Sequence, residues 1–384
     1  MIALNDYIRF TIIFFIAFTG NALLMEIPLM PFLLLFVSII LYKQESLIDR
    51  NNFLTLLLLT ILFVYFFSKN LNEPRIYDPL YLLWPIYLMF FLCLCGKKNL
   101  FESFHPPLIY SLLLIMFFLI GSYIFKDASG RAYFIFGANV LYRLFLFLSL
   151  VQIIHSNNFF TKVAFFIIGL MGVFFTGSRM GLLLAIVLFS LYFLSPYING
   201  VFSKKAMIRL GSLIPIIIFI ALYNLDQITS IYSILSQSEG LISRLLLLSG
   251  GSISIRIQFL SSFIEHLSFF GAHSQIFEFF YFREYFPYPH NIIAELILYY
   301  GFFGLIISLI ILFEYAKTFL KFIKKIKLSP IEIAFLVILP SSLASGDIVD
   351  GLLVLFFSIS SFLSWISNIQ NNLYHQDKNK LNKA

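Results

Sequence analysis

Three short polar stretches interrupt an otherwise apolar chain, and each carries a side chain that could do chemistry. They are Thr176–Arg179, Ser254–Arg256 and Pro289–Asn291. The guanidinium groups of Arg179 and Arg256 are planar forks that suit two-point contacts with a phosphate. The imidazole of His290, when neutral, can accept a proton from an attacking hydroxyl. Together these residue types predict a site for a substrate that carries a phosphate.

Arg179 follows a predicted turn and precedes a predicted apolar helix. Thr176, Gly177 and Ser178 suit a tight turn, and we expect its N–H groups to be exposed at the N-terminus of that helix. Such a helix end favours an anion, because the helix dipole and the unpaired donors point towards it. Ser178 is therefore a candidate substrate ligand beside Arg179. The alternative is an ordinary loop arginine at the level of lipid headgroups.

Arg256 lies in a segment, residues 252–270, that has the periodicity of an amphipathic helix. Its apolar face is formed by Ile253, Ile257, Leu260, Phe263, Ile264, Leu267 and Phe270. Arg256 falls in the middle of this apolar arc. Either its long side chain bends back to water from the first turn, or it points into a polar cavity. In the second case an anionic ligand would offset the cost of a charge on an inward face.

His290 is the first residue of another predicted span. The neighbouring Asn291 can orient its ring or bind a hydroxyl, and Glu295 follows one turn later inside the apolar segment, where a carboxylate needs a partner. Arg143, in the middle of a different span, is either that partner or a residue lining the cavity, and the sequence leaves this open. The alternative for His290 is a structural histidine at the membrane surface.

Composition indicates an all-α, polytopic membrane protein. The chain is 60% hydrophobic and 12% charged, whereas a soluble domain carries about 25% charged residues. Apolar runs of about 17 to 25 residues recur, each long enough to cross a hydrocarbon core of about 30 Å. We expect one integral membrane domain over residues 1–384 with about 12 transmembrane helices. These are expected near residues 8–25, 27–42, 53–68, 80–95, 107–125, 132–154, 161–175, 181–195, 207–222, 291–316, 331–346 and 349–367.

Lysine and arginine placement predicts the orientation. With the N-terminus inside, 17 of the 26 basic residues fall on the inward side, as the positive-inside rule requires, and both ends of the chain are expected in the cytoplasm. The outward side carries Lys69, Arg75, Lys126, Arg131, Arg179, Arg244, Arg256 and Arg283. Most of these are arginines, which suits phosphate or carboxylate contacts. Arg283 is one further candidate substrate ligand. The net charge of +7 reflects the inward bias, so no nucleic-acid partner is expected.

One connection, residues 223–290, is much longer than the others and lies on the outward side. Connections longer than about 12 to 15 residues are commonly functional. This one is rich in Ile, Leu, Phe and Tyr, so we expect it to be ordered. The last outward hairpin contains Asp347 and Asp350, which suit a solvated turn better than a metal or sugar site.

The three polar stretches together resemble the signature of the O-antigen ligase and Wzy-type O-antigen polymerase superfamily. The shared features are Thr-Gly-Ser-Arg-x-Gly before an apolar helix, Arg256 before an amphipathic stretch that ends at Phe269-Phe270-Gly271, and Pro289-His290-Asn291. The last is followed by Glu295 and by an apolar helix over residues 300–305. Their order, their spacing and the long outward connection also match. The resemblance covers about residues 170–315, and each motif alone is weak.

The resemblance implies a metal-independent, inverting glycosyltransferase without a cofactor in the bacterial inner membrane. Its donor would be a glycan on undecaprenyl diphosphate at the periplasmic face. Arg179 and Arg256 would hold the diphosphate, and His290 would be the general base on the acceptor hydroxyl. The outward connections contain no Asp-x-Asp pair, which argues against a metal-dependent mechanism. Expected partners are lipid-linked glycans, membrane lipids, a chain-length regulator and a flippase.

Polymerase and ligase share this signature and differ in the acceptor. A polymerase transfers the glycan to another lipid-linked repeat unit, whereas a ligase transfers it to lipid A-core. We favour the polymerase, because the chain is rich in Phe and Ile and no large soluble domain is evident. The alternative from another class is a flippase or polysaccharide exporter. Such a transporter would need polar residues along a path through many spans, whereas the polar residues here cluster at one face.

Overall fold

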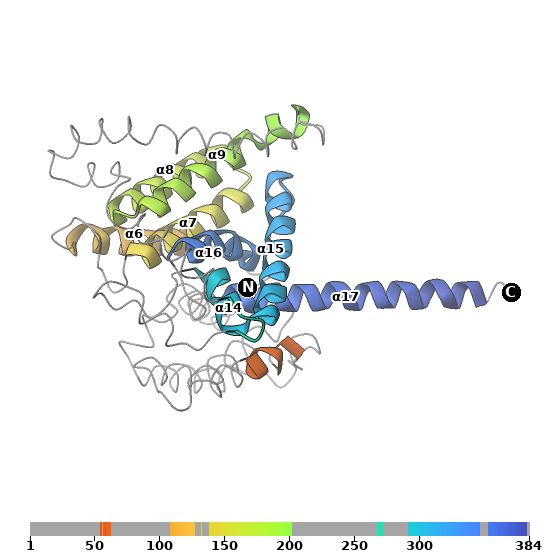
Figure 1. The fold of residues 1–384 in the computed structure, drawn as a ribbon. Coiled ribbons are helices and arrows are strands. Elements are labelled where there is room, and N and C mark those ends of the chain that lie inside the picture. The colour runs from red at the N-terminus through yellow and green to blue at the C-terminus, as the bar shows by residue number, and fades with distance from the viewer. Residues whose placement is uncertain are drawn as a thin grey trace, which may run out of the picture. The chain divides into compact units, whose positions relative to one another are not determined.

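The computed structural model describes residues 54–55, 57–62, 108–126, 132, 138–201, 267–271, 291–345 and 352–381. These residues are almost entirely helical, which confirms the all-α prediction for this part of the chain (Figure 1). The named helices are α6 (Leu108–Ile124), α7 (Ala138–His155), α8 (Phe159–Thr176), α9 (Arg179–Val201), α14 (Ile292–Tyr300), α15 (Phe302–Ile323), α16 (Pro330–Ser345) and α17 (Leu352–Leu381). Residues 54–55 and 57–62 are helical as well.

Three helices, α7, α8 and α15, are long and apolar enough to cross a membrane. Shorter apolar helical stretches are Leu108–Ile124, Arg179–Ser195, Pro330–Leu343 and Val354–Ser367. All seven coincide with spans predicted from the sequence. The spans expected at 8–25, 27–42, 80–95 and 207–222 lie outside the described residues.

Three predicted boundaries are wrong. α7 begins at Ala138 rather than near 132, since Ala132 pairs with Lys126 in an isolated antiparallel bridge. The span expected over 291–316 is two helices, α14 and α15, separated at Gly301, whose φ of 57° and ψ of −127° do not continue a helix. α17 continues to Leu381, beyond the apolar segment that ends at 367 and into the polar tail.

The described helices fall into two compact units. One contains α6, α7, α8, α9 and the segment Phe319–Leu328, and we call it the four-helix unit. The other contains α14, α15 up to Thr318, α16 and α17, and we call it the C-terminal unit.

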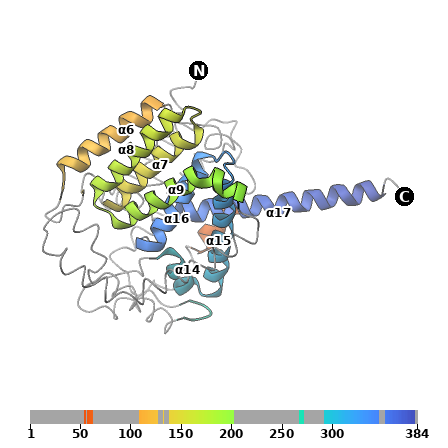
Figure 2. The same cartoon turned by 90° about the horizontal axis from the view of Figure 1, so that it is seen from above.

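In the four-helix unit α7 is the central helix, and α6, α8 and α9 each contact it (Figure 2). Glycines of α8 allow close packing: a Cβ on Gly172 would meet the Phe145 ring, and one on Gly169 would meet Ser149. The earlier residue of α8, Gly169, faces the later residue of α7, Ser149, so α7 and α8 are antiparallel. The C-terminus of α8 therefore lies at the N-terminal end of α7.

The C-terminal unit contains a capping box at the start of α16 and two buried acids, Glu295 and Glu314. Ser329 and Glu332 form a reciprocal capping box around Pro330 at the start of α16, with the Ser329 N–H donating to Glu332 Oε2 at 2.9 Å. In α15 the buried carboxylate of Glu314 accepts from Lys317 Nζ at 3.1 Å and from Ser361 Oγ of α17 at 2.7 Å. The second bond connects α15 with α17.

Candidate functional site

The structure describes five of the eight candidate site residues. Arg143, Ser178 and Arg179 belong to the four-helix unit, and Asn291 and Glu295 belong to the C-terminal unit. His290, Arg256 and Arg283 lie outside the described residues. The roles assigned to His290, Arg256 and Arg283 therefore stay predictions, and whether Arg143 pairs with Glu295 or lines the cavity stays open.

The turn between α8 and α9 is built by its own side chains. α8 ends at Thr176, and Gly177 takes the left-handed conformation, with φ 71° and ψ 17°, that ends many helices. The Thr176 hydroxyl donates to the Val173 carbonyl at 2.7 Å, and Ser178 Oγ accepts from the Gly181 N–H at 3.2 Å. Ser178 therefore caps the N-terminus of α9, and Arg179 is the first residue of that helix.

The prediction of exposed N–H groups in this turn is wrong. The Gly177 N–H donates to the Phe174 carbonyl at 3.1 Å, and the Ser178 N–H donates to the Thr176 hydroxyl at 3.2 Å. Thr176 and Ser178 are buried. The cause is that the C-cap of α8 uses the Gly177 N–H and the Thr176 hydroxyl takes the Ser178 N–H. An anion at this turn would therefore depend on the half-buried Arg179 side chain and on the helix dipole.

Arg143 lies at the same end of the four-helix unit as this turn. Its chain neighbour Tyr142 packs against Gly181 in the first turn of α9, where an added Cβ would lie 2.5 Å from the Tyr142 ring. The Arg143 side chain is 1% exposed, and the helix that carries it is buried on nearly every face. A buried guanidinium requires polar or anionic partners, so Arg143 is a buried cation near the turn whose side chain must be held by such partners.

Lys126 is a third cation at this end, and no role in the site was predicted for it. Its ammonium group lies 5.4 Å from the ring centroid of Phe175 and 5.7 Å from that of Tyr123. Phe175 immediately precedes Thr176, whose carbonyl also accepts from the Ala132 N–H at 3.1 Å. The only sequence signal for Lys126 was its place in a predicted outward connection, because side-chain proximity across helices is not encoded in local spacing.

Asn291 is the N-cap of α14. Its Oδ1 accepts from the N–H groups of Ile293 and Ala294 at 3.0 and 3.1 Å, and its Nδ2 donates to the Leu343 carbonyl of α16 at 2.9 Å. The side chain thus fixes the start of α14 and connects it to α16. This is a structural role that the sequence reasoning did not assign, and binding of a substrate hydroxyl by Asn291 stays a prediction.

Glu295 is fully buried in the first turn of α14. A carboxylate there is favoured by the positive end of the helix dipole. Because Asn291 sets where α14 begins, it also sets the depth at which Glu295 lies. His290, the predicted base, precedes this cap in the sequence and lies outside the described residues.

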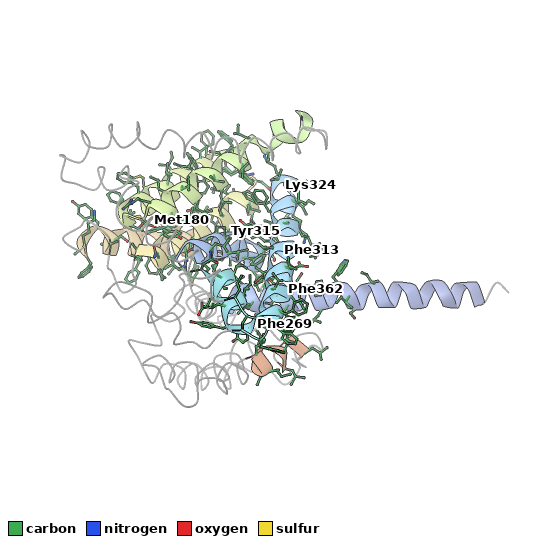
Figure 3. All side chains as sticks on the ribbon, viewed as in Figure 1. Met180, Phe269, Phe313, Tyr315, Lys324 and Phe362 are labelled. Atoms are coloured by element: carbon green, nitrogen blue, oxygen red, sulfur yellow. The ribbon has the colours of Figure 1, made fainter. Side chains whose placement is uncertain are left out.

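The segment 267–271 packs on the junction of α14 and α15. The Phe269 carbonyl accepts from the Phe302 N–H at 2.9 Å, and the two rings stack at 5.3 Å with an interplanar angle of 10° (Figure 3). A Cβ on Gly301 would collide with the Phe269 carbonyl, and one on Gly271 with the Tyr299 carbonyl. Residues 267–268 are not helical and residues 269–270 form a turn closed by the Gly271 N–H donating to the Ser268 carbonyl, so the helix predicted over 252–270 does not reach 270. Residues 252–266 lie outside the described part.

Comparison with known proteins identifies no relative. No protein-family model matches the chain, and neither a curated protein nor a solved structure matches it. The resemblance to the O-antigen ligase and polymerase superfamily therefore stays a proposal based on the motifs.

The arrangement in the four-helix unit suits an anion better than a cation. Arg179, Arg143 and Lys126 lie at one end of α7, and within the described ranges no group of three or more His, Cys, Asp or Glu side chains is placed to hold a metal ion. Metal-independence itself stays a prediction. Positive charge held at fixed positions can bind a phosphate group and stabilise the charge that develops when that group leaves.

Proposed function

We propose that the chain is a membrane-embedded glycosyltransferase of the O-antigen polymerase and ligase superfamily, and that it acts as an O-antigen polymerase. It would join oligosaccharide repeat units carried on undecaprenyl diphosphate at the periplasmic face of the bacterial inner membrane. The observation that carries the proposal is the position of Arg179. It begins α9 directly after a Ser-capped turn, at the end of the unit where Arg143 and Lys126 also lie.

The proposed setting is a multi-pass membrane domain with about 12 helices and both chain ends in the cytoplasm. Support comes from α7, α8 and α15, which are long and apolar enough to cross a membrane. Exposed apolar side chains on α8 and α15 fit a lipid environment: Phe160 is 82% exposed and Leu309 58% exposed.

In the proposed reaction the acceptor hydroxyl attacks the anomeric carbon of the donor glycan. The new glycosidic C–O bond forms as the C–O bond to the diphosphate breaks, with inversion at that carbon. His290 takes the hydroxyl proton, and undecaprenyl diphosphate leaves with the negative charge. Arg179 and Arg256 stabilise that charge through bidentate contacts, which neither lysine nor the turn amides would supply as well.

The proposal is tested by Arg179→Ala, Arg256→Ala and His290→Ala in the native host, with lipopolysaccharide resolved on a gel. We expect each variant to lose the ladder of long chains, because each removes a charge or a base used in the transition state. Lys324→Ala is the matched control, since Lys324 is an exposed cation directly after the C-terminal end of α15. It should leave the ladder intact at equal protein level.

The gel also separates the two acceptor classes. Loss of polymerase activity leaves core plus one repeat unit, whereas loss of ligase activity leaves bare core. If the variants leave bare core, the proposed function changes from polymerase to ligase within the same superfamily. Normal chain lengths in all three variants at normal protein level would contradict the assigned roles altogether.

A further inference from the structure

A second basic site lies at the opposite end of the four-helix unit, around the buried ring of Tyr192 in α9. The Tyr192 hydroxyl donates to the Ile153 carbonyl in the last turn of α7 at 3.0 Å. This bond fixes the ring at the C-terminal end of α7, whereas Gly181 contacts Tyr142 near its N-terminal end. The two positions are separated by about 16 Å along α7, at about 1.5 Å per residue.

Two lysines from different segments approach this one ring. Lys162 Nζ of α8 donates to the Tyr192 hydroxyl at 3.0 Å and lies 5.4 Å from the ring centroid. Lys325 Nζ, from the segment that follows α15, lies 5.0 Å from the same centroid. Phe322 packs beside the ring with its centroid 5.9 Å away. We call Tyr192, Lys162 and Lys325 the Tyr192 cluster.

The backbone at Lys325 adopts a conformation that lysine rarely takes. α15 ends in a Schellman motif, in which the Ile326 N–H donates to the Lys321 carbonyl at 3.0 Å and the Lys325 N–H to the Phe322 carbonyl at 3.1 Å. Lys325 occupies the left-handed position, with φ 54°, where glycine is usual. It is the only non-glycine residue with positive φ in the described part of the chain. A side chain kept at such a position against its backbone preference points to a use for that side chain.

The Tyr192 cluster brings two like charges together, and no carboxylate among the described residues pairs with them. In the described ranges, neither Lys162 nor Lys325 makes an ion pair or a hydrogen bond with an acidic side chain. Burial lowers the pKa of Lys325, and the nearby charge of Lys162 lowers it further. The aromatic face offsets part of this repulsion. An anion between the two ammonium groups would offset the rest.

We propose that the Tyr192 cluster binds the phosphate of an anionic lipid headgroup in the cytoplasmic leaflet. The proposed orientation places Lys162 and Lys325 on the cytoplasmic side, where Lys324 and Lys327 are also exposed. A headgroup phosphodiester presents its charge at the depth of a helix end and can accept from both ammonium groups. This site goes beyond the proposed glycosyl transfer and uses only its membrane setting, not its chemistry.

The test measures thermal unfolding of the full-length protein purified in a neutral detergent. Phosphatidylglycerol, phosphatidylcholine and inorganic phosphate are titrated separately. We expect phosphatidylglycerol to raise the Tm and phosphatidylcholine at equal concentration to raise it much less. Lys162→Gln or Lys325→Gln should weaken the apparent affinity for phosphatidylglycerol by about tenfold or more, the loss expected for one charge-assisted hydrogen bond.

Two further variants separate binding from folding. Lys325→Gly suits a φ of 54° better than lysine does, so it should fold at least as well and still lose the phosphatidylglycerol effect. Lys327→Gln removes an exposed charge from the same segment without touching Tyr192, and it should retain the effect.

The titration with inorganic phosphate shows whether the ligand is a lipid headgroup or a free phosphate. A Tm increase with phosphatidylglycerol alone supports a lipid headgroup, and an increase with inorganic phosphate that also depends on Lys162 and Lys325 supports a free phosphate at the same cluster. The proposal is overturned if no phosphate-bearing probe stabilises the protein. It is equally overturned if Lys327→Gln reduces the effect as much as Lys325→Gly does.

Discussion

The C-terminal ends of α8 and α15 both turn through a left-handed residue, but α8 uses Gly177 and α15 uses Lys325. Gly177 adopts φ 71° without steric cost, and the hydroxyls of Thr176 and Ser178 complete the turn. Lys325 adopts φ 54° at a cost and contacts Tyr192. The first turn is shaped by its backbone requirements, and Arg179, the side chain with the proposed function, comes after it. In the second turn the strained residue, Lys325, is itself the one with the proposed function.

The largest loss of stability is expected at Gly181, where the start of α9 packs against α7. Gly181→Leu places side-chain atoms where the Tyr142 ring now lies, since even a Cβ would be 2.5 Å from it. We expect a loss of about 3 kcal/mol in the free energy of unfolding, the upper range for overpacking a close contact. Denaturant unfolding in detergent measures it. Leu183→Ala is the control, because Leu183 is 58% exposed on the same helix. An equal loss in both variants would argue against the close contact.

The next effect concerns the conformation of Gly177. Gly177→Ala should cost about 1 to 2 kcal/mol, because a Cβ is disfavoured at positive φ. Because the first residue of α9 would shift with the turn, O-antigen chain length should shorten too. A variant with unchanged stability would show that this turn does not require the left-handed conformation.

The Ser178 cap is expected to matter slightly less. Ser178→Ala removes the acceptor for the Gly181 N–H and should cost about 1 kcal/mol. Ser178→Asn, which keeps a capping oxygen, should restore most of the stability. If Ser178 instead contacts the substrate, both variants will lose activity while only the alanine variant loses stability, and this split is read from unfolding and gel data together.

The smallest expected effect is a gain in stability rather than a loss. Lys325→Gly should raise the free energy of unfolding by about 0.5 to 1 kcal/mol in lipid-free detergent, because it relieves the left-handed lysine. Thermal unfolding without added lipid measures this. A loss of stability would show that the contact with Tyr192 outweighs the backbone strain, and the two helix ends would then be more alike than we infer.

The helices were predictable and the way they begin and end was not. Long apolar runs predicted the positions of α6 to α9 and α15 to α17, because a run of this length is typical of a membrane-spanning helix. The same criterion failed at Gly301, because an apolar pattern continues through the break. The break follows from the backbone of Phe269 lying against Gly301, a long-range contact that local spacing does not reveal.

The candidate site was predictable in residue type rather than in geometry. The motif located Arg179 at the start of a helix correctly. It did not predict that Ser178 and Thr176 would engage the turn amides, or that Asn291 would be committed to capping α14 and to Leu343. Lys126 and Lys325 acquire their significance only through aromatic partners on other helices.

The central claim is that Arg179 binds a lipid-linked diphosphate, and binding of undecaprenyl diphosphate to the purified protein tests it most directly. Thermal unfolding of the wild-type protein, Arg179→Ala and Lys324→Ala is followed as the ligand is titrated. The account predicts that the ligand stabilises the wild-type protein and Lys324→Ala, and that Arg179→Ala binds it at least about tenfold more weakly. Equal stabilisation of all three proteins would contradict it.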